Sequence, residues 1–298
     1  MTEREVAADR PAVAGPTVLD ALRLCGLPFR EARRLLATVL EVSDTWLLTH
    51  DAQTLTPGQA AQFFGWAERR RAGEPLAYVL GWREFYGHRF EVDPAVLIPR
   101  PDTELLVEVA LAALPAPGTA ETVPRLLDLG TGSGAVAIAV ALARPDVQVW
   151  ATDHSLDALA VARRNGAMLQ ASNVQWLHGS WWQALEAQPA LAGTLFDVIV
   201  SNPPYIAASD PHLAQGDLRF EPIGALTDHG DGLSHLRILV GGAPAWLQPG
   251  GSLWLEHGYD QAAAVHALFA GAPGWQPSVS HRDLAGIARV TGAGRPAG

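Results

Sequence analysis

After about residue 123, short apolar strands alternate with helices, and this alternation is the feature that most restricts the fold. We expect strands at 126–129, 147–152, 174–177, 196–200 and 252–255, and helices at 135–143, 155–169 and 237–247. A helix between successive strands allows them to lie parallel, with helices covering both faces of the sheet. The sequence therefore predicts an open, parallel α/β sheet of the Rossmann-like kind.

The stretch before this alternation predicts a small helical domain over residues 16–81. Thr56 is a good helix N-cap, because Pro57 suits the first helical position and Gln59 can close a capping box. An earlier helix can begin after Pro28. Three aromatic residues lie in the Thr56-capped helix, and we expect them in the core of this domain rather than against a ligand: Phe63, Phe64 and Trp66.

Residues 82–101 are predicted to join the two domains as a β-hairpin followed by an extended linker. The pair Tyr86-Gly87 suits the turn of the hairpin. Each proline within 97–101 disfavours helix in the residue before it, so that segment should be extended. The α/β domain then covers residues 102–298.

The composition limits the cellular setting of the protein. Cys25 is the single cysteine, so no intrachain disulfide can form, which fits a reducing compartment. Residues 1–15 are polar and charged, which predicts a disordered tail without the features of a signal peptide. The longest apolar stretch, 135–143, is too short to span a bilayer. We therefore expect a cytoplasmic protein that makes no contact with a membrane.

The distribution of charge disfavours a nucleic-acid substrate. The formal net charge is −10, and residues 91–298 hold 20 acidic side chains against 10 arginines. A protein that binds a polyanion needs cations near the site to neutralise the phosphates. We therefore expect no direct contact with nucleic acid.

A glycine-rich turn lies between the first predicted strand and the first predicted helix of the α/β domain. Glycines there allow a tight turn and a close approach of a ligand to the backbone. Asp153 ends the next strand, where its carboxylate can accept hydrogen bonds from both ribose hydroxyls. The order of strand, turn, helix, strand and acid predicts a nucleotide site at Gly130, Thr131, Gly132, Ser133, Gly134 and Asp153. The pattern alone fits NAD as well as S-adenosylmethionine.

A second turn, Asn202-Pro203-Pro204-Tyr205, follows the strand at 196–200. In an open α/β sheet, ligands bind beyond the carboxyl ends of the strands, so this turn should face the same crevice as the glycines. The side-chain oxygen of Asn202 and the carbonyl of Pro203 can each accept one N–H of a planar amide, and Tyr205 can pack on it. Two such acceptors orient a weakly nucleophilic nitrogen toward a sulfonium methyl group.

These motifs resemble those of the HemK/PrmC protein-glutamine methyltransferases, which modify the Gly-Gly-Gln loop of bacterial-type peptide release factors. The resemblance extends from the helical domain nearly to the end of the chain. Beyond the two turns above, it rests on family-like stretches at 73–78, 84–87, 97–104, 220–222 and 283–286. The run Ile-Pro-Arg-Pro-Asp-Thr-Glu within 97–104 is the most specific of them.

The resemblance implies a class I S-adenosylmethionine methyltransferase sheet, with the small helical domain recognising a release factor. It implies that the glycine turn and Asp153 hold S-adenosylmethionine, that Trp181 lies along the adenine, and that residues 202–205 bind the glutamine amide. The family usually has an acidic residue where this chain has Ser180. Trp182 is adjacent, so either indole could contact the adenine.

Other functions and roles remain open from the sequence. An amino-methyltransferase acting on DNA or RNA shares the Asn-Pro-Pro-Tyr turn, an NAD-dependent oxidoreductase shares the glycine turn, and a binding module could carry an inactive site. Arg100, Asp102 and Glu104 could shape the crevice or simply form a linker and helix start. We expect a monomer with no metal site.

Overall fold

The computed structural model describes residues 15–118 and 122–298. The chain divides into two units, Met1–Leu80 and Gly81–Gly298, and each is considered by itself. The predicted disordered tail falls outside the described residues, apart from Gly15, and so does part of the loop that precedes the sheet. Within the part of the chain that the structure describes, no helix is both long and apolar enough to cross a membrane.

The first unit consists of short helices packed around an apolar core. They are α1 (Val18–Leu24), α2 (Phe29–Leu40), α3 (Asp44–Thr49), α4 (Pro57–Arg71) and α5 (Leu76–Leu80). The predicted cap of α4 is confirmed: Gln59 N donates to Thr56 Oγ1 at 3.2 Å, and Thr56 N donates to Gln59 Oε1 at 3.0 Å. Phe63 of α4 is fully buried in this core, as expected.

The second unit begins with the predicted hairpin, formed by β1 (Trp82–Phe85) and β2 (His88–Glu91). Its two turn residues, Tyr86 and Gly87, have φ values of 49° and 74°, the left-handed conformation that a tight two-residue hairpin turn requires. Tyr86 N donates to Glu104 Oε1 at 2.8 Å. Glu104 therefore fixes the hairpin to the start of helix α6 (Glu104–Ala113), which follows a 3-10 turn, η1 (Pro101–Thr103).

A seven-stranded sheet in the order β5-β4-β3-β6-β7-β9-β8 forms the centre of the second unit. Its strands are β3 (Arg125–Leu129), β4 (Gln148–Asp153), β5 (Val174–His178), β6 (Phe196–Ser201), β7 (Leu247–Glu256), β8 (Val279–Arg282) and β9 (Ala288–Gly294). Strands β3 to β7 are parallel, as predicted.

The expectation of a wholly parallel sheet is wrong at one edge, where β9 runs antiparallel to β7 and β8 antiparallel to β9. The connection between β8 and β9 is too short for the crossover that parallel neighbours need, which explains why these two strands are antiparallel. The exposed, polar β8 has no apolar pattern from which a strand could be predicted.

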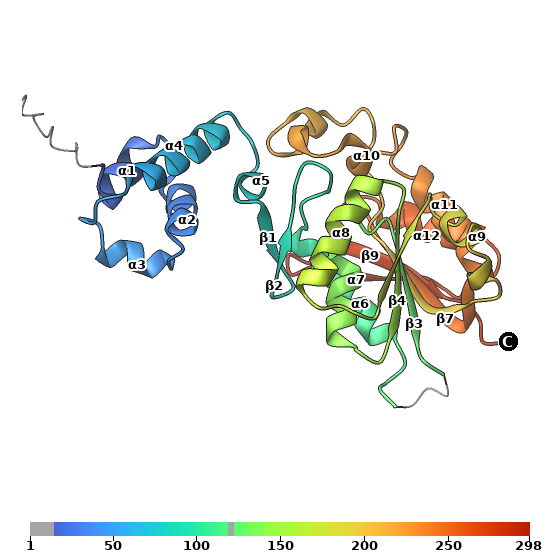
Figure 1. The fold of residues 1–298 in the computed structure, drawn as a ribbon. Coiled ribbons are helices and arrows are strands. Elements are labelled where there is room, and N and C mark those ends of the chain that lie inside the picture. Colours follow the sequence, from blue (N-terminus) through green and yellow to red (C-terminus); the bar gives the residue numbers. More distant parts are fainter. Residues whose placement is uncertain (1–14, 119–121) are drawn as a thin grey trace, which may run out of the picture. The chain divides into compact units, whose positions relative to one another are not determined.

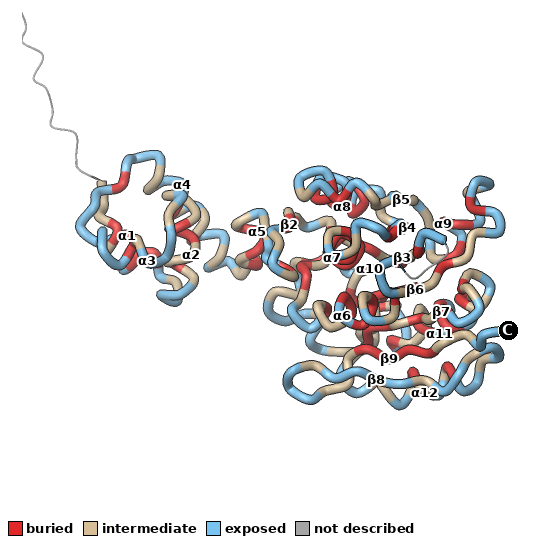
Figure 2. Tube along the Cα trace, turned by 90° about the horizontal axis from the view of Figure 1, so that it is seen from below, coloured by how far each residue is buried: buried red, intermediate tan, exposed pale blue. Residues whose placement is uncertain are grey.

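Helices cover both faces of the sheet (Figures 1 and 2). They are α6, α7 (Ala135–Ala143) and α8 (Leu156–Met168) on one face, and α9 (Gln183–Glu186), α11 (Ser234–Gly242) and α12 (Ala262–Gly271) on the other. Each face of the sheet has its own apolar core, and alternate residues of β3 contribute to one or the other. Leu126 packs with α6 and α7, whereas Leu127 and Leu129 pack with α11 and α12.

One predicted helix, 237–247, has the wrong bounds. The helix α11 begins at Ser234 and ends at Gly242, because a 3-10 turn, η5 (Ala243–Ala245), interrupts it at Pro244. Leu247 already belongs to β7. An interior proline lacks the N–H that helix continuation requires, which explains the early end.

The strand order reverses direction at β3. This strand pairs with β4 on one side and with β6 on the other. A crevice opens at such a switch point, beyond the carboxyl ends of the strands. In this chain that edge carries the glycine turn after β3, Asp153 at the end of β4, and Asn202 directly after β6.

Candidate active site

The glycine turn is held tightly against β4. Gly130 N and Thr131 N both donate to the carbonyl of Thr152 at 2.9 Å. The three glycines, Gly130, Gly132 and Gly134, have φ values of 76°, 56° and 83°, a conformation that other residues adopt only with strain. The turn can follow this path because it carries glycine at all three positions.

Asp153 fixes the turn from the neighbouring strand. Its Oδ2 accepts from Gly132 N and its Oδ1 from Ser155 N, each at 2.9 Å. The side chain is largely buried, with 7% of the residue exposed, yet it lines the cavity at the carboxyl edge of the sheet. Because each carboxylate oxygen has a further lone pair, Asp153 can accept hydrogen bonds from a ligand as well.

Asp128 is a second carboxyl group at this edge, and it is buried at the end of β3. Thr131 Oγ1 donates to its Oδ2 at 2.6 Å. Burial raises the pKa of Asp128 to about 7, and the hydrogen bond from Thr131 acts in the opposite direction. This carboxyl therefore changes its charge close to neutral pH.

A cavity of about 620 Å³ joins the two predicted turns. Its volume lies in the range typical of small-molecule sites. Most of the predicted site residues line it: Gly130, Thr131, Gly132, Ser133, Asp153, Trp181, Asn202 and Pro204. Gly134, Pro203 and Tyr205 are not among the lining residues.

The two adjacent tryptophans have different surroundings. Trp181, which has a φ of 45°, lines the cavity beside Gly130, where an added Cβ atom would lie 3.4 Å from the indole. Trp182 is buried in the core, and its Nε1 donates to the carbonyl of Ile238 at 3.0 Å. Only Trp181 is placed to contact a ligand in the cavity.

Tyr205 points away from the predicted amide site. Its hydroxyl donates to Glu256 Oε1 at 3.3 Å, and Gln261 Nε2 donates to its backbone carbonyl at 2.9 Å. Glu256 is buried at the end of β7. The tyrosine therefore supports the turn from behind, and the cavity wall at this point is formed by Asn202 and Pro204.

Two of the family-like stretches meet at an ion pair whose carboxylate is buried. Arg100 donates to the carboxylate of Glu221, which also accepts from Ile98 N at 3.0 Å. Burial raises the pKa of Glu221, and the adjacent Arg100 opposes that rise. The contact ties the extended segment 97–100, which lines the cavity, to the Phe-Glu-Pro stretch at 220–222.

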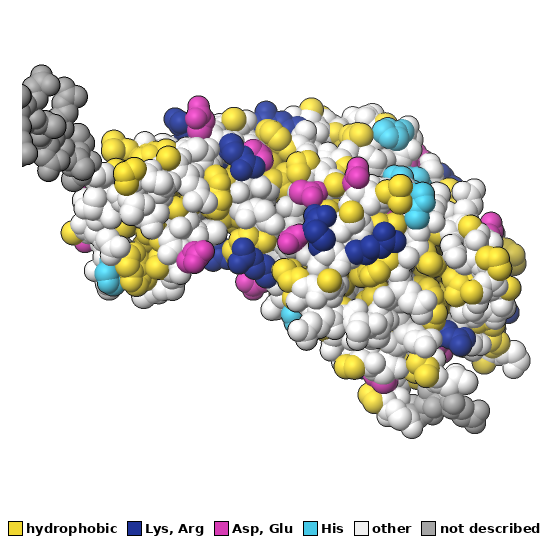
Figure 3. Space-filling view, in the orientation of Figure 1, with side chains coloured by type: hydrophobic (Ala, Val, Ile, Leu, Met, Phe, Trp, Pro, Cys, Tyr) yellow, Lys and Arg dark blue, Asp and Glu magenta, His cyan; other side chains and the backbone are white. Residues whose placement is uncertain are grey.

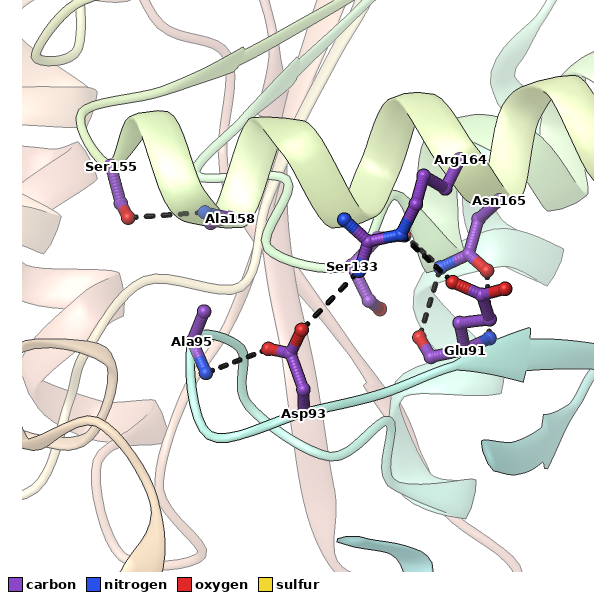
Figure 4. Close-up of polar contacts among 8 residues, drawn as sticks. All are labelled: Glu91, Asp93, Ala95, Ser133, Ser155, Ala158, Arg164 and Asn165. Atoms are coloured by element: carbon purple, nitrogen blue, oxygen red, sulfur yellow. Dashed lines mark hydrogen bonds and ion pairs between the residues drawn. The ribbon is translucent and has the colours of Figure 1, made fainter. Parts of the chain in front are cut away.

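A further set of contacts ties the hairpin to the glycine turn (Figure 4). Asn165 of α8 donates from Nδ2 to the carbonyls of Glu91 and Ser133, and accepts from Glu91 N at 2.7 Å. Arg164, next to it, pairs with Glu91 and Asp93. The end of the hairpin, helix α8 and the glycine turn are thereby fixed to one another.

Sequence reasoning missed three histidines that line the cavity: His154, His229 and His235. The ring of His235 lies 5.1 Å from that of Trp181. Burial lowers the pKa of His235, while nearby Asp228 acts to raise it. No group of three or more potential ligands in the described residues could hold a metal ion. Two of the three histidines lie in loops and His235 lies in the first turn of α11, so no periodic pattern in the sequence marks these positions.

The cavity fits an adenosyl cofactor. The backbone at Gly132 is open, because a Cβ atom built there meets no heavy atom within 4 Å. Trp181 offers a flat aromatic face, and the carboxylate of Asp153 offers acceptors for hydroxyl groups and favours positive charge. These are the features that an adenine, a ribose and a sulfonium group require.

The cavity lies at the switch point of the sheet, between the glycine turn and the Asn-Pro-Pro-Tyr turn. This combination defines a Rossmann-like methyltransferase. Two family models agree with this class: residues 19–81 match the PrmC N-terminal domain, and residues 103–217 match the Methyltransferase small domain.

Comparison with curated proteins identifies the family. The chain is 55% identical to the release factor glutamine methyltransferase of Bordetella pertussis, over 92% of this chain and 97% of that protein. It is 51% identical to the enzyme of the same name from Neisseria gonorrhoeae, over 91% and 94%. The chain belongs to the release factor glutamine methyltransferase family, which confirms the resemblance seen in the sequence.

Proposed function

We propose that this enzyme transfers a methyl group from S-adenosylmethionine to the side-chain amide nitrogen of the glutamine in the Gly-Gly-Gln loop of peptide chain release factors. The observation that carries this proposal is that Asn202 and the glycine turn line the same cavity. The relatives named above supply the substrate class, since both bear the name release factor glutamine methyltransferase.

The cofactor is S-adenosylmethionine, which supplies an electrophilic methyl group on a sulfonium sulfur. Asp153 accepts from the ribose hydroxyls, and the backbone of residues 130–134 allows the close approach of the nucleoside. Trp181 packs along the adenine. The Asn-Pro-Pro-Tyr turn on the same cavity, and the methyltransferase family to which the chain belongs, argue against an NAD-dependent oxidoreductase.

Asn202 orients the substrate. Its side-chain oxygen accepts one N–H of the glutamine amide, and the carbonyl of Pro203 accepts the other. Both acceptors favour the partial positive charge that grows on the nitrogen during methyl transfer. Because the amide is a weak nucleophile, holding its nitrogen in line with the methyl group contributes directly to the rate. Pro203 and Pro204 restrict the backbone of the turn, and Tyr205 supports the turn through its contact with Glu256.

The partner is a protein rather than a nucleic acid. Residues 16–81 form the domain that recognises the release factor outside its loop, and the hairpin and extended segment at 82–101 pack with the methyltransferase domain at 102–298 in one unit. On the face shown in Figure 3, arginines lie among acidic side chains and form no separate basic patch. The enzyme acts as a monomer in the cytoplasm.

A transfer assay tests this function. The enzyme is incubated with methyl-labelled S-adenosylmethionine and, in separate reactions, with a full-length release factor or with duplex DNA. We expect label in the release factor and none in the DNA. Label in DNA adenine with none in the release factor would overturn the proposal in favour of a nucleic-acid amino-methyltransferase.

A further inference from the structure

The side chain of Asn202 is held from behind by a second residue. Its Nδ2 donates to Thr103 Oγ1 at 3.2 Å. Thr103 ends the 3-10 turn η1 and is only 5% exposed. The turn is itself anchored, because Asp102 pairs with Arg289 of β9 at 3.3 Å. Thr103 is thus a buried hydroxyl, fixed in place, that contacts the amide-binding side chain.

A buried carboxyl lies behind Thr103. Glu256 is 2% exposed, and its Oε1 accepts from the hydroxyl of Tyr205. Its Oε2 is also buried and has no hydrogen-bond partner among the described residues. The hydroxyls of Thr103 and Tyr205 both lie near enough to favour the charged form of this carboxyl, against the larger opposing effect of burial. Because an orphaned carboxylate oxygen is costly, the proton of Thr103 is best directed at Glu256.

This arrangement determines the direction of each hydrogen bond. A hydroxyl has one proton to donate. If Thr103 donates that proton to Glu256, its oxygen can only accept from Asn202. The atom of Asn202 that faces Thr103 must then be the nitrogen, and the side-chain oxygen is left toward the cavity.

We propose that Thr103 and Glu256 are positioning residues that hold the Asn202 oxygen toward the substrate, and that they thereby make the site select glutamine over glutamate. The inference rests on the proposed function. Glutamine presents an NH2 group with two donors, which the Asn202 oxygen can accept. An ionised glutamate presents acceptors alone, so it would face the Asn202 oxygen without a proton between them.

Replacement of Thr103 by valine removes this constraint on the orientation of the Asn202 amide. Valine has nearly the shape of threonine but cannot accept a hydrogen bond, so the Asn202 amide becomes free to rotate. It can then turn its NH2 group toward the cavity, where that group donates to a carboxylate. Binding of glutamine should weaken and binding of glutamate should improve.

The test measures binding rather than turnover. Dissociation constants are measured at pH 8, with S-adenosylhomocysteine present, for a release factor and for its variant with Gln→Glu in the Gly-Gly-Gln loop. We expect the preference for glutamine to fall about tenfold or more in Thr103→Val, the effect of one lost hydrogen bond. Thr103→Ser keeps the hydroxyl and should restore the preference. Thr194→Val, before the amino end of β6, is the matched control and should leave it unchanged.

Glu256→Gln provides a second variant that does not alter Thr103. Its amide can donate as well as accept, so Thr103 is no longer constrained to donate, and the preference for glutamine should again fall. The proposal is overturned if Thr103→Val or Glu256→Gln binds S-adenosylhomocysteine normally and keeps the full preference. If the unmodified enzyme itself shows no preference for glutamine and does not methylate the release factor, the proposed function fails instead.

Discussion

At the scale of single residues, Asp153 joins the fold to the cofactor site, because the same carboxylate holds Gly132, Ser155 and the proposed ribose. Asp153→Ala should weaken S-adenosylmethionine binding about ten- to a hundredfold, since a charge-assisted hydrogen bond contributes roughly 1.5–3 kcal/mol. Asp153→Asn should lose less, because it keeps one acceptor. Isothermal titration calorimetry measures both, and unchanged affinity in a folded Asp153→Ala protein would refute the ribose assignment.

How much of the site could be predicted from sequence depends on how the residues are related along the chain. The glycine turn and Asn202 each follow a recognisable strand, so their place at the carboxyl edge could be predicted. Thr103 could not, because its contact with Asn202 joins positions 99 residues apart. Glu256 also ends a parallel strand and could have been found by the same rule, although the predicted strand stopped one residue short of it.

At the scale of elements, Gly134 controls how helix α7 packs on the sheet. An added Cβ atom there would lie 2.9 Å from Ile138 Cδ1 and 3.1 Å from the Trp176 ring, at a φ of 83°. Gly134→Ala should therefore lower the free energy of unfolding by about 2–4 kcal/mol, from backbone strain plus overpacking.

Gly132→Ala is the matched control, because its Cβ atom would meet no heavy atom within 4 Å although its φ is 56°. Gly132→Ala should lower the free energy of unfolding by only about 1–2 kcal/mol, from backbone strain alone. Urea denaturation of the two variants checks the difference, and equal losses would show that packing against Ile138 and Trp176 is unimportant.

The elements predicted best are those with a strong apolar pattern. The helix 135–143 was predicted with its observed bounds, and each predicted parallel strand is present. The edge strands β8 and β9 were missed, because β8 is exposed and polar and its pairing depends on β9 rather than on its own sequence. The prediction of a helix at 237–247 is wrong at its end because Pro244 lies inside that range and stops the helix.

At the scale of the whole molecule, buried titratable groups make stability depend on pH in two opposite ways. Burial raises the pKa of Asp128 and of Glu256 to about 7, from ordinary values of 3.8 and 4.5. Their contribution to the free energy of unfolding is fully present at a pH below those ordinary pKa values, and it is lost as the pH rises through 7. Burial lowers the pKa of His235 and His257 from 6.5, so their contribution is present above 6.5 and is lost as the pH falls.

Glu256→Gln isolates one of these effects. The variant has no carboxyl to ionise, so relative to the unmodified protein it should gain roughly 1–3 kcal/mol of unfolding free energy between pH 5 and pH 8. The groups that act on Glu256, namely Thr103, Tyr205, Asp102 and Arg289, are unchanged in the comparison. Denaturation at the two pH values measures the gain, and a difference that does not vary with pH would contradict the burial of an ionisable group here.

The division of the chain predicts where it can be shortened. Deletion of residues 1–80 removes the first unit and leaves the hairpin, which Glu104 and Asn165 fix to the second. The shortened protein should bind S-adenosylmethionine with nearly normal affinity but methylate a release factor much more slowly, because a loop alone offers little binding area. Deletion of residues 1–91 also removes the hairpin and should cost stability. Equal methylation rates before and after deletion of 1–80 would contradict a recognition role for the helical domain.

The central claim is that the methyl group is placed on one side-chain amide of a protein, and the most direct measurement is tandem mass spectrometry of a full-length release factor after reaction with the enzyme. We predict a single added methyl group, located on the side chain of the glutamine in the Gly-Gly-Gln loop. A release factor with Gln→Asn at that position should remain unmodified, because a side chain one methylene shorter cannot reach Asn202 and the methyl group together. A methyl group on any other residue, or equal modification of the Gln→Asn protein, would contradict the account.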